Sequence, residues 1–333
     1  MQILTPKYMN YNFSERGYTV VPPNKIENEN ERDTIFYSAG IQPLLQRYSL
    51  GDFRDQQRLF IAQPVVRTQF LPKLKEGTGL AFVNATTASF NLSETEYLKL
   101  VKDWLELFAE LGFNKEDITR RDDIYKDTWD GMEIEGKRTF YYYRGIEIGD
   151  TTFFTQTSNP SIETFCDLGF GAERLRWSAN KDKSYFDIES DSSDLPANVK
   201  GLISAISLLA LNGVKPANKN AGYRAKVFSK TLAEALSLRE LNERELSYVG
   251  ETVRYWQDWQ QIEGDADEIL KMIDSWYTGN CHRLLINQLA GEYPVSGIKI
   301  EQNGQVLSRG ALVKKLTGSG VSNHRIPTSY RGE

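Results

Sequence analysis

The order of strand-like and helix-like segments constrains the fold of this chain most. Residues 18–90 hold four β-rich runs, and one helical stretch separates them from further β-rich runs at 137–150, 151–157 and 162–169. Parallel strands need a long crossover connection, usually a helix, between each pair. Most of these runs are instead joined by turn residues. The order therefore predicts an α+β fold in which an antiparallel sheet carries helices on one side, rather than alternating βαβ units.

The helical stretch has a clear start and end. Ser93 and Glu96 form a capping-box pattern, and Gly112 is suited to end the helix. Apolar residues between them recur at helical spacing. We expect the buried side of this helix to carry Leu98, Val101, Leu105, Phe108 and Leu111.

The character of the chain changes near residue 190. The segment 197–289 is helical in pattern almost throughout, and Asn-Gly-Gln at 303–305 indicates a small late hairpin. We therefore expect two domains, with an α+β domain at 1–190 and a mostly helical domain at 191–333.

Composition excludes several classes of protein. The formal net charge of −5 provides no global basic field for nucleic acid, and two cysteines cannot build a disulfide framework. No apolar run approaches the roughly 20 residues that span a bilayer, and the first residues lack the pattern of a signal peptide. The expectation is a cytoplasmic protein without a membrane partner.

The stretch TFCDLGFGAERLRW at 164–177 is the most informative about function. A dinucleotide-binding G-x-G-x-x-G motif is excluded, because Arg174 stands at the third glycine position and no βαβ unit surrounds it. Strand alternation places Glu163, Phe165, Asp167 and Gly169 on one face. Two acids on one face suit an ammonium group or a metal, and an arginine at the edge suits a phosphate. A tight turn between a strand and a helix explains the glycines equally well.

This stretch resembles motif 3 of class II aminoacyl-tRNA synthetases. DLGFGAERL is similar to the D-T-G-M-G-L-E-R of the alanyl-tRNA synthetase family. Four other segments are similar to that family in the same order. They are IFYSAGIQPL at 35–44, QPVVR at 63–67, IEIGDTTFF at 146–154 and NGVKPANKNAGYRAKVFSKTL at 212–232. The resemblance implies a sheet of the class II synthetase type.

The resemblance assigns the nucleotide-binding roles residue by residue. Arg67 matches the motif 2 arginine that contacts the α-phosphate of ATP and the carboxylate end of the amino acid. Phe82 matches the residue on which adenine stacks, although a core aromatic is nearly as good an interpretation. Arg174 matches the arginine on the γ-phosphate, and Gly171 leaves room for ATP. Arg67 and Arg174 are accordingly the expected catalytic residues.

The amino-acid-binding roles fall on three other residues. Asp167 and Gly169 match the positions that hold the substrate's α-amino group. Asp150 stands where the family has an asparagine, and an acid there suits the ammonium group or Mg²⁺. Glu163 and Asp150 are therefore the candidate metal ligands, and ATP with Mg²⁺ is the expected cofactor pair.

The chain also departs from the family. Val83 replaces the acid after the stacking phenylalanine, and Gly149 replaces a tryptophan, which suggests a larger amino-acid pocket. AKVFSKTL at 225–232 has fewer cations than its counterpart, and we expect no editing domain. Residues 240–333 match nothing in the family.

Three functional hypotheses follow. The losses slightly favour a relative that adenylates a small, alanine-like amino acid and transfers it to a carrier protein, a peptide or a small amine. The alternative is an alanyl-tRNA synthetase that charges tRNA. The third is an inactive binding or regulatory module that kept the fold. The joint presence of Arg67, Asp167, Gly169, Gly171 and Arg174 argues against the third.

Overall fold

The computed structural model describes residues 4–28, 35–129, 131–180, 184–187 and 194–331. It divides into two compact units, one of residues 1–187 with 256–263 and one of residues 188–255 with 264–333. The expected boundary near residue 190 lies outside the described residues. Inclusion of 256–263 in the first unit was not expected from the sequence.

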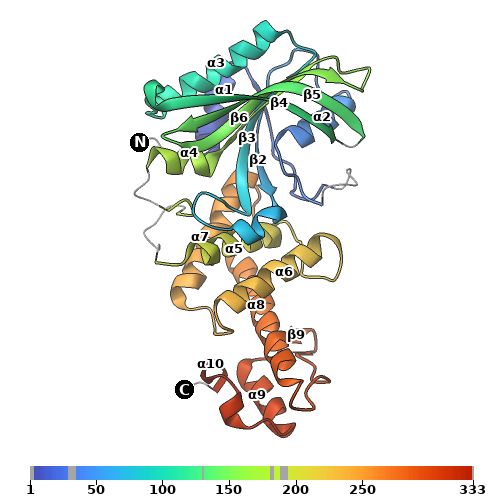
Figure 1. Cartoon of the computed structure of the whole chain (residues 1–333). Helices are drawn as coiled ribbons and strands as arrows, with labels where there is room; N and C mark the ends of the chain where they lie inside the picture. Colours follow the sequence, from blue (N-terminus) through green and yellow to red (C-terminus); the bar gives the residue numbers. More distant parts are fainter. Residues whose placement is uncertain (1–3, 29–34, 130, 181–183, 188–193, 332–333) are drawn as a thin grey trace. The chain divides into compact units, whose positions relative to one another are not determined.

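A seven-stranded sheet forms the centre of the first unit among its described residues (Figure 1). Its order is β1-β2-β3-β7-β6-β5-β4, and every neighbouring pair is antiparallel except β1 and β2. The α+β fold class is thus confirmed, with one parallel pair added at the edge. The strands are β1 (Thr19–Val21), β2 (Leu59–Val66), β3 (Ala81–Phe90), β4 (Ile118–Trp129), β5 (Met132–Tyr143), β6 (Ile146–Thr157) and β7 (Phe165–Gly171).

Strand β4 was missing from the sequence interpretation. Its charged run RRDD gives no apolar alternation, and nearly all of its side chains are exposed at the edge of the sheet. Charges on an edge strand are a common protection against pairing with another chain. The run at 137–150 is also two strands, because Arg144 and Gly145 turn the chain with positive φ angles of 48° and 80°.

Helices cover both faces of the sheet, not one face as the sequence order suggested. The helices α1 (Pro6–Glu15) and α3 (Glu94–Glu110) lie on one face, where Phe13 stacks on Phe60 and Trp104 packs on Phe170. The helix α2 (Ile41–Ser49) lies on the other face. It belongs to a buried cluster that contains Ile41, Leu44, Leu59, Ile61, Ala88, Phe90, Phe154 and Phe165. This cluster fills only part of that face and leaves the ends of β3, β6 and β7 for the pocket described below.

The helix α3 begins as expected but turns a different side to the sheet. The Ser93 hydroxyl accepts a hydrogen bond from the backbone N–H of Glu96 at 3.2 Å. Leu98 is 57% exposed and Leu105 is only half-buried, so these two positions were wrong. Aromatic and aliphatic residues one position away form the buried stripe instead, namely Tyr97, Leu100, Val101, Trp104, Leu107 and Phe108.

Shorter elements connect the strands to their helices. The 3-10 helices η1 (Thr68–Lys73) and η2 (Lys115–Asp117) follow β2 and α3, and the helix α4 (Ala172–Ala179) follows β7 directly. In the loop after η1, the carboxylate of Glu76 accepts hydrogen bonds from the Ser184 hydroxyl at 2.6 Å and the Tyr185 backbone N–H at 2.8 Å. The loop between β2 and β3 is therefore held to the segment after α4.

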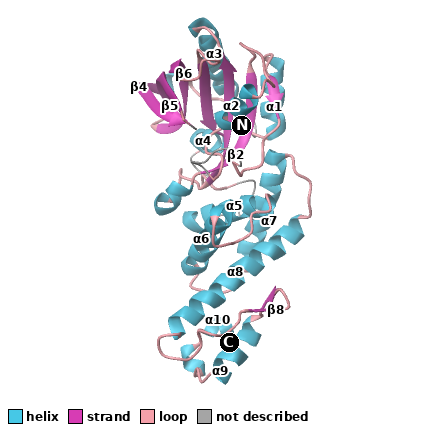
Figure 2. Ribbon diagram, turned by 90° about the vertical axis from the view of Figure 1, so that its right-hand side faces the viewer, coloured by secondary structure: helices cyan, strands magenta, loops and turns pink. Residues whose placement is uncertain are grey.

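The second unit is mostly helical, as expected, with one small hairpin (Figure 2). The strands of this hairpin are joined by Asn303 and Gly304, both with positive φ, which is the preferred turn for a two-residue hairpin loop. Its elements are α5 (Ala197–Leu211), α6 (Asn220–Ala235), α7 (Glu243–Gln260), α8 (Ala266–Leu289), β8 (Glu301–Gln302), β9 (Gln305–Val306), α9 (Arg309–Gly318), η3 (Asn323–Arg325) and α10 (Thr328–Arg331). The last residues of α7 belong to the first unit, because that unit includes residues 256–263.

A buried histidine fastens the end of the second unit to α8. His282 Nε2 lies 2.7 Å from the Leu307 carbonyl oxygen, and Nδ1 lies 3.1 Å from the Tyr330 hydroxyl. The Arg309 guanidinium covers the Tyr330 ring at 4.2 Å and donates to the Leu238 carbonyl. His282 is thus a structural residue. Within the described part of the chain, no helix is long and apolar enough to span a membrane.

Candidate active site

A small hollow gathers most of the expected site residues on the sheet face that carries α2, beyond the part that the α2 cluster covers. It is formed where β3, β6 and β7 meet the start of α4 and the loop that follows β2. The residues that line it are Arg67, Phe70, Gly79, Phe82, Asn84, Glu147, Ile148, Gly149, Asp150, Gly169, Gly171, Arg174 and Tyr185.

Arg67 is held rigidly at the rim of this hollow. It follows the last residue of β2, and its backbone N–H donates to the Leu80 carbonyl at 2.8 Å. Its Nε donates to the Ser38 carbonyl at 2.9 Å, and its guanidinium carbon lies 4.9 Å from the centre of the Phe82 ring. Within the described ranges, its two terminal nitrogens form no hydrogen bond, so they stay available to a ligand. Such a fixed guanidinium suits bidentate contact with a phosphate or a carboxylate.

Two carboxylates lie close together on the same face. In the β6–β7 register Asp150 is opposite Gly169 and Thr152 is opposite Asp167, so the two acids are diagonal neighbours. Diagonal pairs of this kind are about 7–8 Å apart along the backbone and still within reach of each other's side chains. Oδ1 of Asp167 is buried and has no hydrogen-bond partner among the residues that the structure describes. One oxygen of this carboxyl group therefore stays available to a ligand.

Burial changes the acidity of both carboxyl groups. It raises the pKa of Asp150 to about 6, while nearby Arg138 and Arg67 act in the opposite direction. Burial, and then the negative charge of Asp150, raise the pKa of Asp167 to about 8 against the effect of Arg67. Burial also lowers the pKa of Arg67, with Asp150 opposing. Burial, which disfavours the charged form of each group, is the largest cause of all three shifts.

Asn84 is a site residue that the sequence reasoning missed. Its Oδ1 accepts hydrogen bonds from the Gly40 backbone N–H at 2.7 Å and from the Thr86 hydroxyl at 2.9 Å. A Cβ at position 169 would lie 3.2 Å from Asn84 Nδ2, closer than most real contacts. Asn84 thus fixes the segment before α2 to β3 and leaves little room for a side chain at the diagonal position 169. Its signal in the sequence is a buried amide in the otherwise apolar and hydroxyl-bearing strand AFVNATTASF.

The two glycines of the motif 3 resemblance have different reasons to be glycine. Gly169 is crowded by Asn84, whereas a Cβ at Gly171 would meet only Arg174 at an ordinary 3.6 Å. The protein itself therefore does not require glycine at 171. Its bare backbone lines the hollow and leaves that space to a ligand.

The acid and the arginine after these glycines also have separate roles. Both carboxylate oxygens of Glu173 accept from the Val83 backbone N–H at 3.0 Å, where β7 has ended and provides no strand partner. Arg174 Nη1 donates to Glu147 Oε1 at 3.1 Å and to the Glu147 carbonyl at 3.3 Å. Glu173 is therefore structural, and Arg174 is held at the edge of the hollow by β6.

Gly149 does not enlarge the pocket in the way the sequence suggested. The β5–β6 register shifts here, since Tyr141 is opposite Gly149 and Tyr142 is opposite Glu147. A Cβ on Gly149 would lie 2.3 Å from the Gly169 carbonyl oxygen and 2.5 Å from a Phe170 ring carbon. A side chain at 149 would point into β7 rather than into the hollow. The close approach of two strands, not a missing tryptophan, explains this glycine.

Glu163 does not join the other site residues. It is exposed before the start of β7, where its backbone N–H donates to Asn91 Oδ1 at 2.8 Å. Four residues of extended chain separate it from Asp167, roughly 13 Å. Among the described residues, no group of three or more His, Cys, Asp or Glu side chains is arranged to hold a metal.

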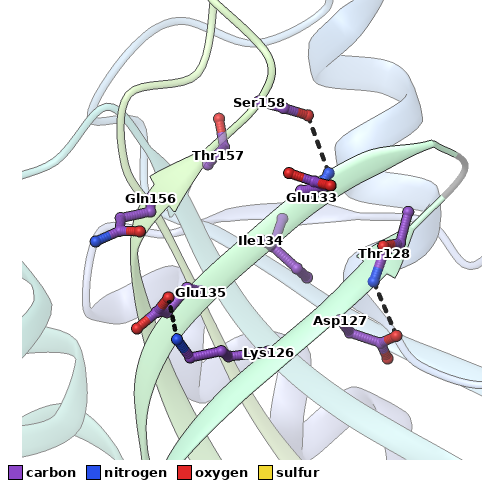
Figure 3. Close-up of a pocket in the computed structure, with 9 residues that line it drawn as sticks. All are labelled: Lys126, Asp127, Thr128, Glu133, Ile134, Glu135, Gln156, Thr157 and Ser158. Atoms are coloured by element: carbon purple, nitrogen blue, oxygen red, sulfur yellow. Dashed lines mark hydrogen bonds and ion pairs between the residues drawn. The ribbon is translucent and has the colours of Figure 1, made fainter.

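A second hollow lies far from these motifs, at the ends of β4, β5 and β6 (Figure 3). It is larger, about 490 Å³ against about 50 Å³. Its charges satisfy each other locally, as in the 2.7 Å ion pair between Lys126 and Glu135, and Ser158 accepts from the Glu133 backbone N–H. Size alone is therefore a poor guide, and the smaller hollow with unsatisfied charge is the candidate site.

Two comparisons with known proteins found similar chains, and a third found none. No family model matches the chain. A curated relative, an alanine–tRNA ligase of Borrelia hermsii, is 24% identical over 182 residues, which is 50% of this chain and 30% of that ligase. A solved structure of a pyrrolysyl-tRNA synthetase from Desulfitobacterium hafniense is 13% identical, covers 51% of this chain and 64% of its own, and has a TM-score of 0.35.

The similarity to the ligase supports a class II synthetase-like domain in this chain. The mixed seven-stranded sheet with flanking helices and the helical region that follows agree with this identification. The chain spans less than a third of the length of the ligase it matches.

Proposed function

We propose that this synthetase-like domain activates a small amino acid with ATP to form an aminoacyl-adenylate and pyrophosphate. The observation that carries the proposal is a fixed guanidinium in the hollow, that of Arg67, near an acid beside the lining residue Gly169, Asp167, whose buried Oδ1 has no partner among the described residues. Arg67 complements a carboxylate or a phosphate, and Asp167 complements an ammonium group. An amino acid presented to ATP carries these complementary groups.

In the proposed reaction the amino acid's carboxylate oxygen forms a bond to the α-phosphorus of ATP. The bond from that phosphorus to the oxygen bridging to the β-phosphate breaks, and pyrophosphate leaves. Negative charge shifts toward the α-phosphoryl oxygens and the leaving group as this happens. Arg67 would stabilise the charge on the α-phosphoryl oxygens, and Arg174, at the edge of the hollow, would stabilise the charge on the leaving pyrophosphate. The rate gain would therefore come from positioning and electrostatic stabilisation. No side chain needs to become a covalent nucleophile.

The nucleotide has an obvious place beside Arg67. Phe82 is half-buried, lines the hollow and already carries the Arg67 guanidinium against its ring. Adenine stacking on this ring agrees with the assignment from the resemblance. Mg²⁺ would be held chiefly by the ATP phosphates and water, since it needs few protein ligands and prefers phosphate oxygens. It would neutralise phosphate charge.

Pyrophosphate–ATP exchange tests the proposal. Purified protein with ATP and Mg²⁺ is expected to exchange labelled pyrophosphate into ATP when a small amino acid is added. Arg67→Ala should lower the rate by at least ~10²-fold, the usual effect of removing one preorganised donor to developing charge. The control is Arg144→Ala, since Arg144 is an exposed turn residue paired with Asp117. Absence of exchange with every amino acid would favour an inactive binding module.

The acceptor of the activated amino acid is a separate question. The matched relative is a tRNA ligase by name, and neither the structure nor the comparisons support the expectation of a carrier protein, a peptide or a small amine. We therefore take tRNA as the first acceptor to test. Incubation with ATP, labelled amino acid and total tRNA should give acid-precipitable label that RNase removes. Adenylate formation without such label would favour the hypothesis of a non-tRNA acceptor.

A further inference from the structure

The charges around the hollow do not balance. Two ion pairs are closed by the protein itself, Arg174 with Glu147 at 3.1 Å and Arg138 with Asp123 at 2.9 Å. Three further ionisable groups lie close by, namely Arg67 and Asp150 in the lining and Asp167 beside the lining residue Gly169. Neither Asp150 nor Asp167 forms an ion pair within the described part of the chain. These seven groups are therefore four carboxyl groups and three guanidinium groups, so one carboxyl group has no guanidinium group of its own.

An alanine-like substrate would leave this imbalance in place. In the proposed function, the α-ammonium group forms an ion pair with Asp167, and the phosphate of the developing adenylate forms an ion pair with Arg67. Binding of these two groups adds one positive and one negative charge, so Asp150 still shares the Arg138 and Arg67 guanidinium groups with Asp123 and the phosphate. Removing a charge from water without a partner is among the costliest arrangements in a protein. Only a cationic group on the ligand, or a proton, compensates it.

The position of Asp150 indicates which part of the substrate it would meet. It lines the hollow directly opposite Gly169 and diagonal to Asp167. The diagonal spacing suits two ammonium groups that are two or three carbons apart.

We propose that the amino acid activated at this site carries a second ammonium group on a short side chain, which pairs with Asp150 while the α-ammonium group pairs with Asp167. The class is that of short diamino acids, with 2,3-diaminopropionate and 2,4-diaminobutyrate as the probes. This proposal rests on the proposed adenylation. A hydroxyl group on the substrate can donate to Asp150 but leaves the charge uncompensated, so serine is a weaker candidate.

The deciding experiment measures pyrophosphate exchange with matched amino acids. 2-Aminobutyrate has nearly the shape of 2,3-diaminopropionate but a methyl group in place of the second ammonium group. In the wild type, kcat/KM for at least one diamino acid should exceed that for 2-aminobutyrate, alanine and serine by at least ~30-fold. That factor corresponds to the lower end of the effect of removing one member of a buried charge pair.

Substitution of Asp150 should remove this preference. In Asp150→Asn, the ratio of diamino acid to 2-aminobutyrate should fall by at least ~30-fold, whereas exchange with 2-aminobutyrate itself should persist. Asp122→Asn is the matched control, because Asp122 is an exposed sheet residue that accepts a hydrogen bond from Thr139. If Asp150→Asn does not fold, the comparison of 2,3-diaminopropionate with 2-aminobutyrate in the wild type decides alone.

The possible failures are distinguishable. Exchange that is best with alanine, serine or 2-aminobutyrate would overturn the diamino-acid proposal and leave adenylation standing. An unchanged ratio in Asp150→Asn would also overturn it. No exchange with any amino acid would overturn both proposals together.

Discussion

Asp167→Asn should act in opposite directions on the empty and the loaded protein. In the empty protein, Oδ1 of Asp167 is buried without a partner, and the pKa of the carboxyl is raised to about 8 by burial and by Asp150. In the unfolded chain the same group ionises near pH 3.9. Between these values the native state binds more protons than the unfolded state, so the stability of the wild type falls as pH rises from about 4 to about 8. Asparagine carries no charge and escapes this loss.

The size of the effect follows from the cost of an unsatisfied buried polar group, about 1–3 kcal/mol. We expect Asp167→Asn to raise the free energy of unfolding of the empty first unit by about that amount at pH 8. For a domain of this size the melting temperature should rise by about 2–10 °C, and by less at pH 5. In the loaded protein, the lost ammonium contact should weaken amino-acid binding by about 2–5 kcal/mol.

Thermal unfolding at pH 5 and pH 8 measures the first effect, and calorimetric titration with the activated amino acid measures the second. Asp122→Asn serves as the control, because the same chemical change on an exposed residue should leave both quantities nearly unchanged. A lower melting temperature for Asp167→Asn at pH 8, or the same gain at both pH values, would show that Asp167 is not an uncompensated carboxyl. Equal weakening of ATP and amino-acid binding would show that it does not contact the ammonium group.

Two further predictions concern positions outside the direct contacts of the substrate. Gly149→Trp should destabilise the first unit instead of narrowing the pocket, because even a Cβ there would lie 2.3 Å from the Gly169 carbonyl oxygen. A variant with the wild-type melting temperature and an altered amino-acid preference would contradict this. His282 is buried and burial lowers its pKa, so the unfolded chain takes up a proton first on acidification and the second unit should lose stability as pH falls below about 6.5. His282→Gln should reduce this acid sensitivity, and denaturant titrations of both proteins between pH 5 and pH 7.5 would measure it.

The sequence by itself determined the features that depend on local chemistry. Turn residues between β-rich runs excluded a βαβ fold, the Ser93 cap started a helix, and Asn303–Gly304 made a hairpin. The motif resemblance also named Arg67, Asp150, Gly169, Gly171 and Arg174 before their position was known, and the structure brings these into one hollow.

Only the tertiary structure decided the features that depend on register and packing. The charged strand β4 has no apolar alternation of its own and is stabilised by pairing with β5. Glu163 and Asp167 share an alternation pattern, yet Glu163 lies before the sheet begins and never reaches the hollow. Asn84 becomes a site residue only because the β3–β7 register sets it opposite Gly171 and diagonal to Gly169, near the carboxyl groups of Asp150 and Asp167, whose pKa values burial raises. A sequence lists its charges, but which of them lose contact with water is decided by what packs around them.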